Sequence, residues 1–185
     1  TSFVPLEDRP AFDVQTSGST GEPVSIKKTA INQVVWLAMT IRENEWYGRN
    51  LRCKRSIIKA SNKKTEIING DDHQTQFISI TSPLSEQLAL LEEFQPNILM
   101  VHPSILYGML NIWEDKGLSL TELLHIKTIG ETVTENLRTK TKRITNLELM
   151  DMYSSNEVGY ISIQCPESGL HHVMSESLIV DIVND

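Results

Sequence analysis

Short apolar segments alternate with longer segments of helical periodicity along this chain, and that alternation limits the possible folds more than any other feature. The apolar runs 97–101 and 123–130 have the length of buried strands, and 104–117 between them places apolar residues at helical spacing. Strands that alternate with helices of ten or more residues indicate an α/β fold with a mainly parallel sheet flanked by helices.

The expected elements cover most of the chain. A helix is predicted for 31–47, and Ser82, Ser104 and Thr132 are expected to cap three further helices, of which the second ends at Gly117. Residues 62–74 are expected to form a polar loop, and two strands are expected to flank the segment 16–21. The remaining expected strands are 55–61, 75–81, 97–101, 123–130, 146–153, 160–165 and 177–183.

The segment 16–21, Thr-Ser-Gly-Ser-Thr-Gly, concentrates hydroxyl groups and glycines between two expected strands. Gly18 and Gly21 let a ligand approach the main chain, and consecutive backbone N–H groups can bind an anion. Pro23 stands where the kinase-type phosphate loop would need glycine, so this is not that motif. An ordinary hairpin turn remains the alternative.

Two other candidate loops follow expected strands, where ligands bind in parallel sheets. Gly130 permits close approach and Glu131 follows it directly, although a capped connection between strand and helix explains both. In the segment 153–157, Tyr-Ser-Ser-Asn-Glu, the Glu157 carboxylate suits Mg²⁺ and Tyr153 offers an aromatic face. A helix that starts at Ser155 or Asn156 is the alternative for this segment.

The order of these segments resembles the adenylate-forming superfamily of acyl-CoA ligases and adenylation domains, and within it the phenylacetate-CoA ligase-like branch. The segment 16–23 matches the family signature TSG[ST]TGxP, and the Tyr-x-x-x-Glu element at 153–157 is similar to the family's YGxTE. The resemblance covers nearly the whole chain and implies that 1–185 is the central part of an AMP-binding domain, without the first part of the N-terminal domain and without the mobile C-terminal domain.

The resemblance implies a role for each matching residue. The loop Thr16, Ser17, Gly18, Ser19, Thr20 and Gly21 would close over the β- and γ-phosphates of ATP. Tyr153, Ser154 and Asn156 would lie at the nucleotide, and Gly130 and Glu131 would line the same pocket. Thr20 and Glu157 would act in catalysis, with Glu157 as the Mg²⁺ ligand. ATP and Mg²⁺ are the implied cofactors, coenzyme A is the implied co-substrate, and a small carboxylic acid is the implied substrate.

Three departures from the family pattern keep a second hypothesis open. Ser154 replaces the family's glycine, Asn156 replaces its threonine or serine, and Val24 stands where many members carry lysine. These changes affect rate more than nucleotide binding, so a non-catalytic nucleotide- or acyl-binding module is the alternative to a ligase. An α/β interaction domain with coincidental loops is a third possibility.

The charge of the chain limits the classes of binding partner, and its cysteine content favours one cellular compartment. The chain has 17 Lys and Arg against 24 Asp and Glu, and its net charge of −7 argues against nucleic acid as the main partner. No apolar run is long enough to cross a membrane. Two cysteines are too few for a disulfide scaffold, which favours the cytoplasm.

Cys165 and His171 stand at a spacing that could supply two zinc ligands, with His172 or Glu176 as further candidates. A buried cysteine and a hydrogen-bonded loop histidine are the simpler interpretation. Trp36, Trp46 and Trp113 lie in helical patterns and are expected in the core.

Overall fold

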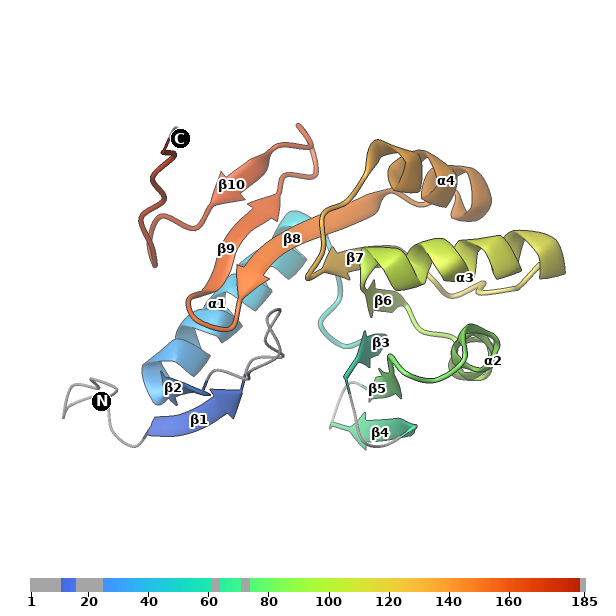
Figure 1. Ribbon diagram of the computed structural model, residues 1–185, viewed down its shortest axis with the longest axis horizontal. Coiled ribbons are helices and arrows are strands. Elements are labelled where there is room, and N and C mark those ends of the chain that lie inside the picture. The colour runs from blue at the N-terminus through green and yellow to red at the C-terminus, as the bar shows by residue number, and fades with distance from the viewer. Residues whose placement is uncertain (1–10, 16–24, 61–63, 71–73, 184–185) are drawn as a thin grey trace. The chain divides into compact units, whose positions relative to one another are not determined.

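The computed structural model describes residues 11–15, 25–60, 64–70 and 74–183. The chain forms two compact units (Figure 1). Unit 1 contains residues 1–49 and 153–185, and unit 2 contains residues 50–152. No helix in the described ranges is long and apolar enough to span a membrane.

Unit 2 is built on a mainly parallel sheet, as the sequence predicted. Its strand order is β8-β7-β6-β3-β5-β4, and every neighbouring pair is parallel except β4 with β5. The strands are β3 (Lys54–Lys59), β4 (Thr65–Asn69), β5 (Gln74–Ser79), β6 (Ile98–Val101), β7 (His125–Ile129) and β8 (Leu149–Ser155), the last of which continues into unit 1.

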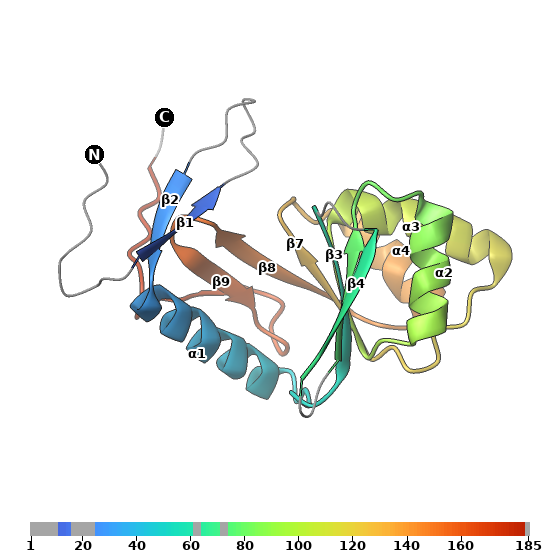
Figure 2. The same cartoon turned by 90° about the horizontal axis from the view of Figure 1, so that it is seen from below.

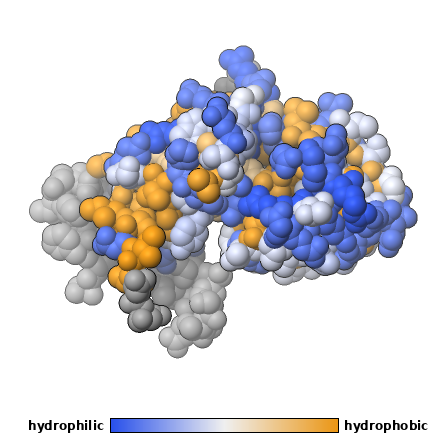
Figure 3. All heavy atoms as spheres, turned by 90° about the horizontal axis from the view of Figure 1, so that it is seen from above, coloured by the Kyte–Doolittle hydropathy of each residue, from blue (hydrophilic) through white to orange (hydrophobic). Residues whose placement is uncertain are grey.

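Three helices lie on the same side of this sheet (Figure 2). They are α2 (Leu84–Phe94), α3 (Pro103–Lys116) and α4 (Glu135–Thr145). Apolar residues of the sheet and of these helices form one buried core, in which Ile58, Leu91, Leu110 and Ile126 are completely buried. In Figure 3 the right-hand part of the molecule, which is unit 2, presents mostly hydrophilic side chains on the face shown.

The helices are where the sequence predicted them, but their predicted caps are wrong. Pro83, His102 and Thr134 occupy the N-cap positions of α2, α3 and α4. Pro103 is the first residue of α3, so Ser104 falls inside the first turn, and Thr134 instead of Thr132 accepts the N–H of Leu137. Gly117 ends α3 in the left-handed conformation, as predicted.

Unit 1 contains helix α1 (Ala30–Trp46), the antiparallel pair β1 (Ala11–Gln15) and β2 (Ser25–Thr29), and the antiparallel pair β9 (Gly159–Gln164) and β10 (His171–Val173). Thr29 and Asn32 form a capping box that starts α1. The buried residues of α1 are Met39, Glu43 and Asn44. The helix therefore buries a partly polar face, whereas Ile31 and Val34, whose helical spacing led to its prediction, are exposed.

One predicted loop and one predicted strand differ from the structure. The expected polar loop 62–74 contains the edge strand β4, whose Ile67 and Ile68 stay about half exposed. The expected strand 177–183 is not formed, because this segment pairs with no strand in the described part of the chain, and β10 takes the place beside β9 instead. The apolar residues of 177–183 indicated a strand, but the segment has no strand partner in the described ranges.

Candidate functional site

The segment 153–157 forms the end of β8 and the start of a tight turn into β9. The alternative of a helix start at Ser155 or Asn156 is therefore wrong. The Ser155 hydroxyl accepts the N–H of Val158 at 3.3 Å and helps to fix the turn. The Tyr153 side chain is 60% exposed, and Asn156 and Glu157 are also exposed, so this turn presents its side chains outward.

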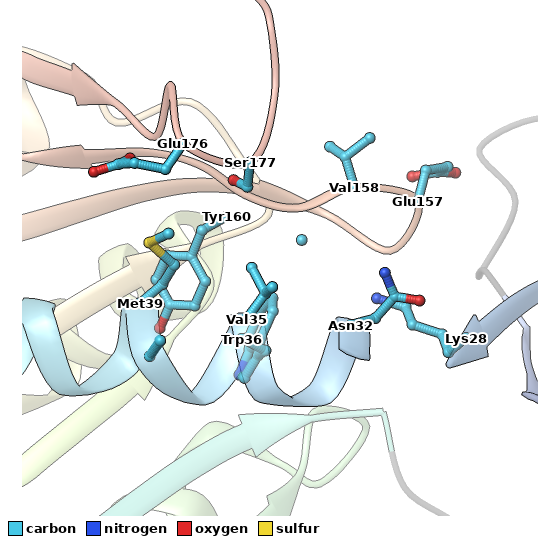
Figure 4. A pocket seen from close by; sticks show the side chains of 12 residues that line it. Lys28, Asn32, Val35, Trp36, Met39, Glu157, Val158, Tyr160, Glu176 and Ser177 are labelled. Atoms are coloured by element: carbon cyan, nitrogen blue, oxygen red, sulfur yellow. The ribbon is translucent and has the colours of Figure 1, made fainter. Parts of the chain in front are cut away.

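Glu157 lies at the rim of a pocket of about 270 Å³ within unit 1 (Figure 4). The pocket lies between α1, the β8–β9 turn and the segment after β10. It combines a polar rim with an apolar floor. The rim carries Lys28, Asn32, Glu157, Glu176 and Ser177, and the floor carries Val35, Trp36, Met39 and Tyr160.

The rim holds charges of both signs. The hydrogen bond from the Ser155 hydroxyl and the backbone N–H of Glu157 lower the pKa of the Glu157 carboxyl, and Lys28 lowers it further by charge. Glu176 also has a lowered pKa, because its own backbone N–H and the Arg42 guanidinium, at 2.7 Å, stabilise its charged form. The pocket thus offers two ionised carboxylates and one amine close to apolar walls.

The floor is held by a buried polar network behind Tyr160. The Tyr160 hydroxyl donates to Glu43 at 3.0 Å and lies 3.2 Å from the Thr40 hydroxyl, and its ring packs on Trp36 with centroids 4.5 Å apart. Trp36 was expected in the core but is 40% exposed and lines the pocket. Trp46 is 37% exposed, whereas Trp113 is buried as predicted.

Gly130 and Glu131 belong to unit 2, where they follow β7. Gly130 has a φ of +80°, and a Cβ there would lie 2.8 Å from the His102 ring, so both conformation and packing require glycine. The Glu131 carboxylate accepts the N–H and the hydroxyl of Ser104 at 2.8 Å each. In this structure Glu131 therefore caps α3, which leaves its predicted role at the nucleotide a prediction.

The predicted phosphate loop, Thr16 to Gly21, lies outside the described residues. Sequence reasoning missed Lys28, Asn32 and Tyr160 of the pocket. The only signal for Lys28 was a cation placed soon after the glycine loop, and surface lysines are too common for that position to be distinctive. Asn32 gave no signal because it lies in a segment predicted as a helix. Its side-chain oxygen accepts the Thr29 N–H at 2.8 Å.

The zinc site that the spacing of Cys165 and His171 left as an alternative is not formed among the described residues, in which no three His, Cys, Asp or Glu side chains gather to hold a metal ion. His171 lies 2.9 Å from the Ser162 hydroxyl through Nδ1. Cys165 contacts His172 instead, at a place separate from the pocket of Glu157.

Comparison with protein-family models and with curated proteins gave no match. Solved structures do match. A luciferase-like enzyme from the mealworm Zophobas morio has 20% identity and a TM-score of 0.61 over 90% of this chain and 39% of its own. A 2-hydroxyisobutyryl-CoA ligase in complex with its acyl-AMP and CoA has 11% identity and a TM-score of 0.67 over 90% and 41%. An anthranilate CoA ligase, AuaEII, in complex with anthranoyl-AMP has 14% identity and a TM-score of 0.63 over 83% and 31%.

These identities are low, so the likeness establishes the fold and not the activity. The chain spans about a third to two-fifths of the length of these structures. The mainly parallel α/β architecture predicted from the sequence is confirmed by both the strand pairing and this likeness.

Proposed function

We propose that this chain, which has the fold of the N-terminal domain of adenylate-forming enzymes, is the central part of an AMP-binding domain in an ATP-dependent acid–thiol ligase. The observation that carries the proposal is the ionised Glu157 carboxylate at a pocket rim, directly after the last parallel strand of the sheet. The carboxyl ends of parallel strands are where such folds bind their ligands.

Glu157 fits a magnesium ion that arrives with a nucleotide. Mg²⁺ in nucleotide sites is held by one or two carboxylates, substrate phosphates and water, and does not need a closed set of protein ligands. An exposed carboxylate with a lowered pKa meets that need, and no cluster of three acidic or histidine ligands occurs in the described ranges. When bound, Mg²⁺ would neutralise phosphate charge during transfer.

The other pocket residues would contact different parts of the ligand. The Lys28 amine would attract an anionic group, either a phosphate or the acid's carboxylate. The Trp36 and Tyr160 rings and Met39 would pack against an apolar body. The loop 16–21 would supply further N–H and hydroxyl donors to phosphate, as the resemblance implies.

The proposed reaction has two steps. A carboxylate oxygen attacks the α-phosphorus of ATP, and the bond to pyrophosphate breaks, which gives an acyl-adenylate. The sulfur of a thiol such as coenzyme A then attacks the acyl carbonyl, and AMP leaves. This chemistry depends on positioning and charge stabilisation more than on an acid–base pair. Both cysteines are free, in keeping with action in the cytoplasm.

ATP–pyrophosphate exchange in the full-length gene product, with a panel of aryl and short acyl acids, tests the proposal. We expect exchange with at least one acid and a loss of at least about tenfold in Glu157→Gln, which is worth about 1.4 kcal/mol. Glu176→Gln is the matched control, because it removes a carboxylate from the same pocket that Arg42 already engages. Absence of exchange with every acid would contradict the ligase.

A non-catalytic nucleotide-binding module is the second candidate, and Ser154 and Asn156 favour it because they depart from the family pattern. Calorimetry with Mg·ATP separates the two. Binding without exchange favours the module, and binding with exchange favours the ligase. Equal Mg·ATP affinity in Glu157→Gln and the unaltered protein would remove Glu157 from the metal site.

A further inference from the structure

A second pocket, of about 310 Å³, lies in unit 1 between the end of α1 and the turn that connects β9 to β10. Trp46, Cys165, Pro166, Glu167 and His172 line it. None of these residues takes part in the proposed ligase reaction. The pocket combines a sulfur nucleophile, an imidazole and an aromatic wall, which together are suited to chemistry at the sulfur.

The local sequence fixes the backbone at Cys165. Cys165 opens the turn, since the Gly169 N–H donates to the Cys165 carbonyl at 3.0 Å and the Cys165 N–H donates to the Leu170 carbonyl at 2.7 Å. Gly169 adopts a φ of +73°, which other residues rarely allow. The Gln164 amide also donates to the Gly169 carbonyl at 2.9 Å. The turn is therefore closed by several hydrogen bonds and holds Cys165 against the pocket.

Donor groups surround the sulfur and favour its charged form. The Ser168 hydroxyl, the backbone N–H groups of Ser168 and Glu167, and the His172 side chain lower the pKa of the Cys165 thiol to about 7. The lowered pKa favours the thiolate, which is the nucleophilic form, more than in an ordinary cysteine. The titratable groups lining the pocket are Cys165, Glu167 and His172, and α1 contributes only the Trp46 ring, 5.3 Å from His172.

We propose that Cys165 is a modification site, a nucleophilic thiol that forms mixed disulfides with small, uncharged aromatic disulfides. The Cys165 thiolate attacks one sulfur of the disulfide, and a new S–S bond forms as the original one breaks. Cys165 is thereby oxidised, and the other sulfur leaves as a reduced thiolate that takes a proton from water. The disulfide reagent is the oxidant, and no metal or further cofactor is needed.

The lining of the pocket sets the preferred reagent. Trp46 and Pro166 offer flat apolar surface for an aromatic ring. The Glu167 carboxylate stands directly beside them and disfavours an anionic reagent. Two aromatic disulfides test this preference. The neutral 2,2′-dithiodipyridine should be favoured, and the anionic 5,5′-dithiobis(2-nitrobenzoate) should be disfavoured.

Cys53, in unit 2, provides an internal reference, because within residues 1–185 Cys53→Ser leaves only Cys165 and Cys165→Ser leaves only Cys53. The rate of mixed-disulfide formation with the neutral reagent is measured from about pH 5 to about pH 9. In Cys53→Ser the rate should rise with a midpoint near pH 7. Adding Ser168→Ala should move that midpoint towards about 8.5, and adding His172→Gln should move it the same way by less.

Charge selection gives a second readout that a merely exposed cysteine would not show. The preference of Cys165 over Cys53 should be larger with the neutral reagent than with the anionic one, and Glu167→Gln should reduce that difference. A midpoint unchanged by Ser168→Ala and His172→Gln, or Cys165 reacting no faster than Cys53 at about pH 6 with both reagents, would overturn the proposal.

Discussion

Ser104 donates its backbone N–H to one oxygen of the Glu131 carboxylate and its hydroxyl to the other, each at 2.8 Å. Ser104 lies in the first turn of α3, where backbone N–H groups have no partner within the helix. The first turn of α3 carries no acidic residue and His102 makes no capping bond from its side chain. Glu131, from the end of β7, therefore supplies the negative charge that the start of α3 lacks.

We expect Glu131→Ala to lower the free energy of unfolding by about 1–2 kcal/mol, because the cap and its favourable charge are both lost. Urea denaturation followed by circular dichroism measures this. Glu148→Ala is the matched control, since the Glu148 side chain is 82% exposed. Equal stability of the Glu131 and Glu148 variants would show that the contact contributes nothing.

The effects of Glu131→Ala and Ser104→Ala should also not add. Glu131→Ala removes both hydrogen bonds, whereas Ser104→Ala removes only the one from the hydroxyl, because the backbone N–H of residue 104 remains. The hydroxyl bond is lost in both single variants, so the double variant should be less destabilised than the sum of the two. Full additivity would mean that the two residues act independently.

A side chain at Gly130 is expected to be costly. Gly130→Ala meets two obstacles, the φ of +80° and a Cβ position 2.8 Å from the His102 ring. Gly117→Ala meets only the first, since its φ is +65° and nothing lies within 4 Å of the added atom. We expect a loss of about 1 kcal/mol for Gly117→Ala and a distinctly larger loss for Gly130→Ala.

His102→Ala in the Gly130→Ala background separates the two obstacles. Removing the ring should recover the packing part of the loss and leave the backbone part, so that the double variant resembles Gly117→Ala. Thermal unfolding of Gly117→Ala, Gly130→Ala and the double variant provides the comparison. If His102→Ala recovers nothing, the ring contact is not what excludes a side chain at Gly130.

The sequence predicted the elements of unit 2 well because its strands and helices carry strong periodic patterns. Residues 98–101 are all apolar, the segment 123–130 contains four leucine and isoleucine residues, and α3 places Leu106, Met109, Leu110 and Trp113 on one buried face. These patterns lie within single segments, so they can be recognised without knowing the tertiary contacts. The helix caps were less predictable, because Ser104 satisfies a carboxylate 27 residues away instead of its own helix.

The site was predictable only in part for a related reason. Glu157 stood out because it belongs to a motif, whereas Tyr160 and Trp36 join the pocket through packing between α1 and β9. The strand predicted for 177–183 shows the opposite error. An apolar segment can form a strand, but only the fold decides whether a partner strand is present beside it.

Unit 1 contains a buried ion pair. Arg49 donates to Glu43 at 2.6 Å, and both side chains are 2% exposed. Removing one partner leaves an uncompensated buried charge, so Arg49→Met should lower the free energy of unfolding by about 3–5 kcal/mol. The double variant Glu43→Leu with Arg49→Met should recover part of this loss.

Arg42→Met is the matched control for the buried pair. Arg42 pairs with Glu176 at 2.7 Å, close to the 2.6 Å between Arg49 and Glu43, but the side chains of Arg42 and Glu176 are 35% and 54% exposed. The expected loss is therefore within about 1 kcal/mol. Similar losses for Arg42→Met and Arg49→Met in urea denaturation would show that burial does not set the strength of these pairs.

Tyr160 should make the protein less stable at alkaline pH. Burial raises the pKa of its hydroxyl far above the ordinary value, and the Glu43 carboxylate raises it further. The native state therefore keeps this proton when the unfolded chain begins to lose it, at about pH 10. The stabilisation is complete below that pH, and above it the free energy of unfolding should fall by up to about 1.4 kcal/mol per pH unit for this group.

Tyr160→Phe isolates that contribution. The variant loses the hydrogen bond to Glu43 at every pH, so it should be less stable throughout, but its stability should fall less steeply above about pH 10. The measurement is urea denaturation at several alkaline pH values, and the quantity compared is the slope, because a loss of packing or of one hydrogen bond shifts the whole curve without changing that slope. Parallel curves for the two proteins would mean that the Tyr160 hydroxyl ionises equally easily in the folded and unfolded chains, and that the network behind the pocket floor is open to water.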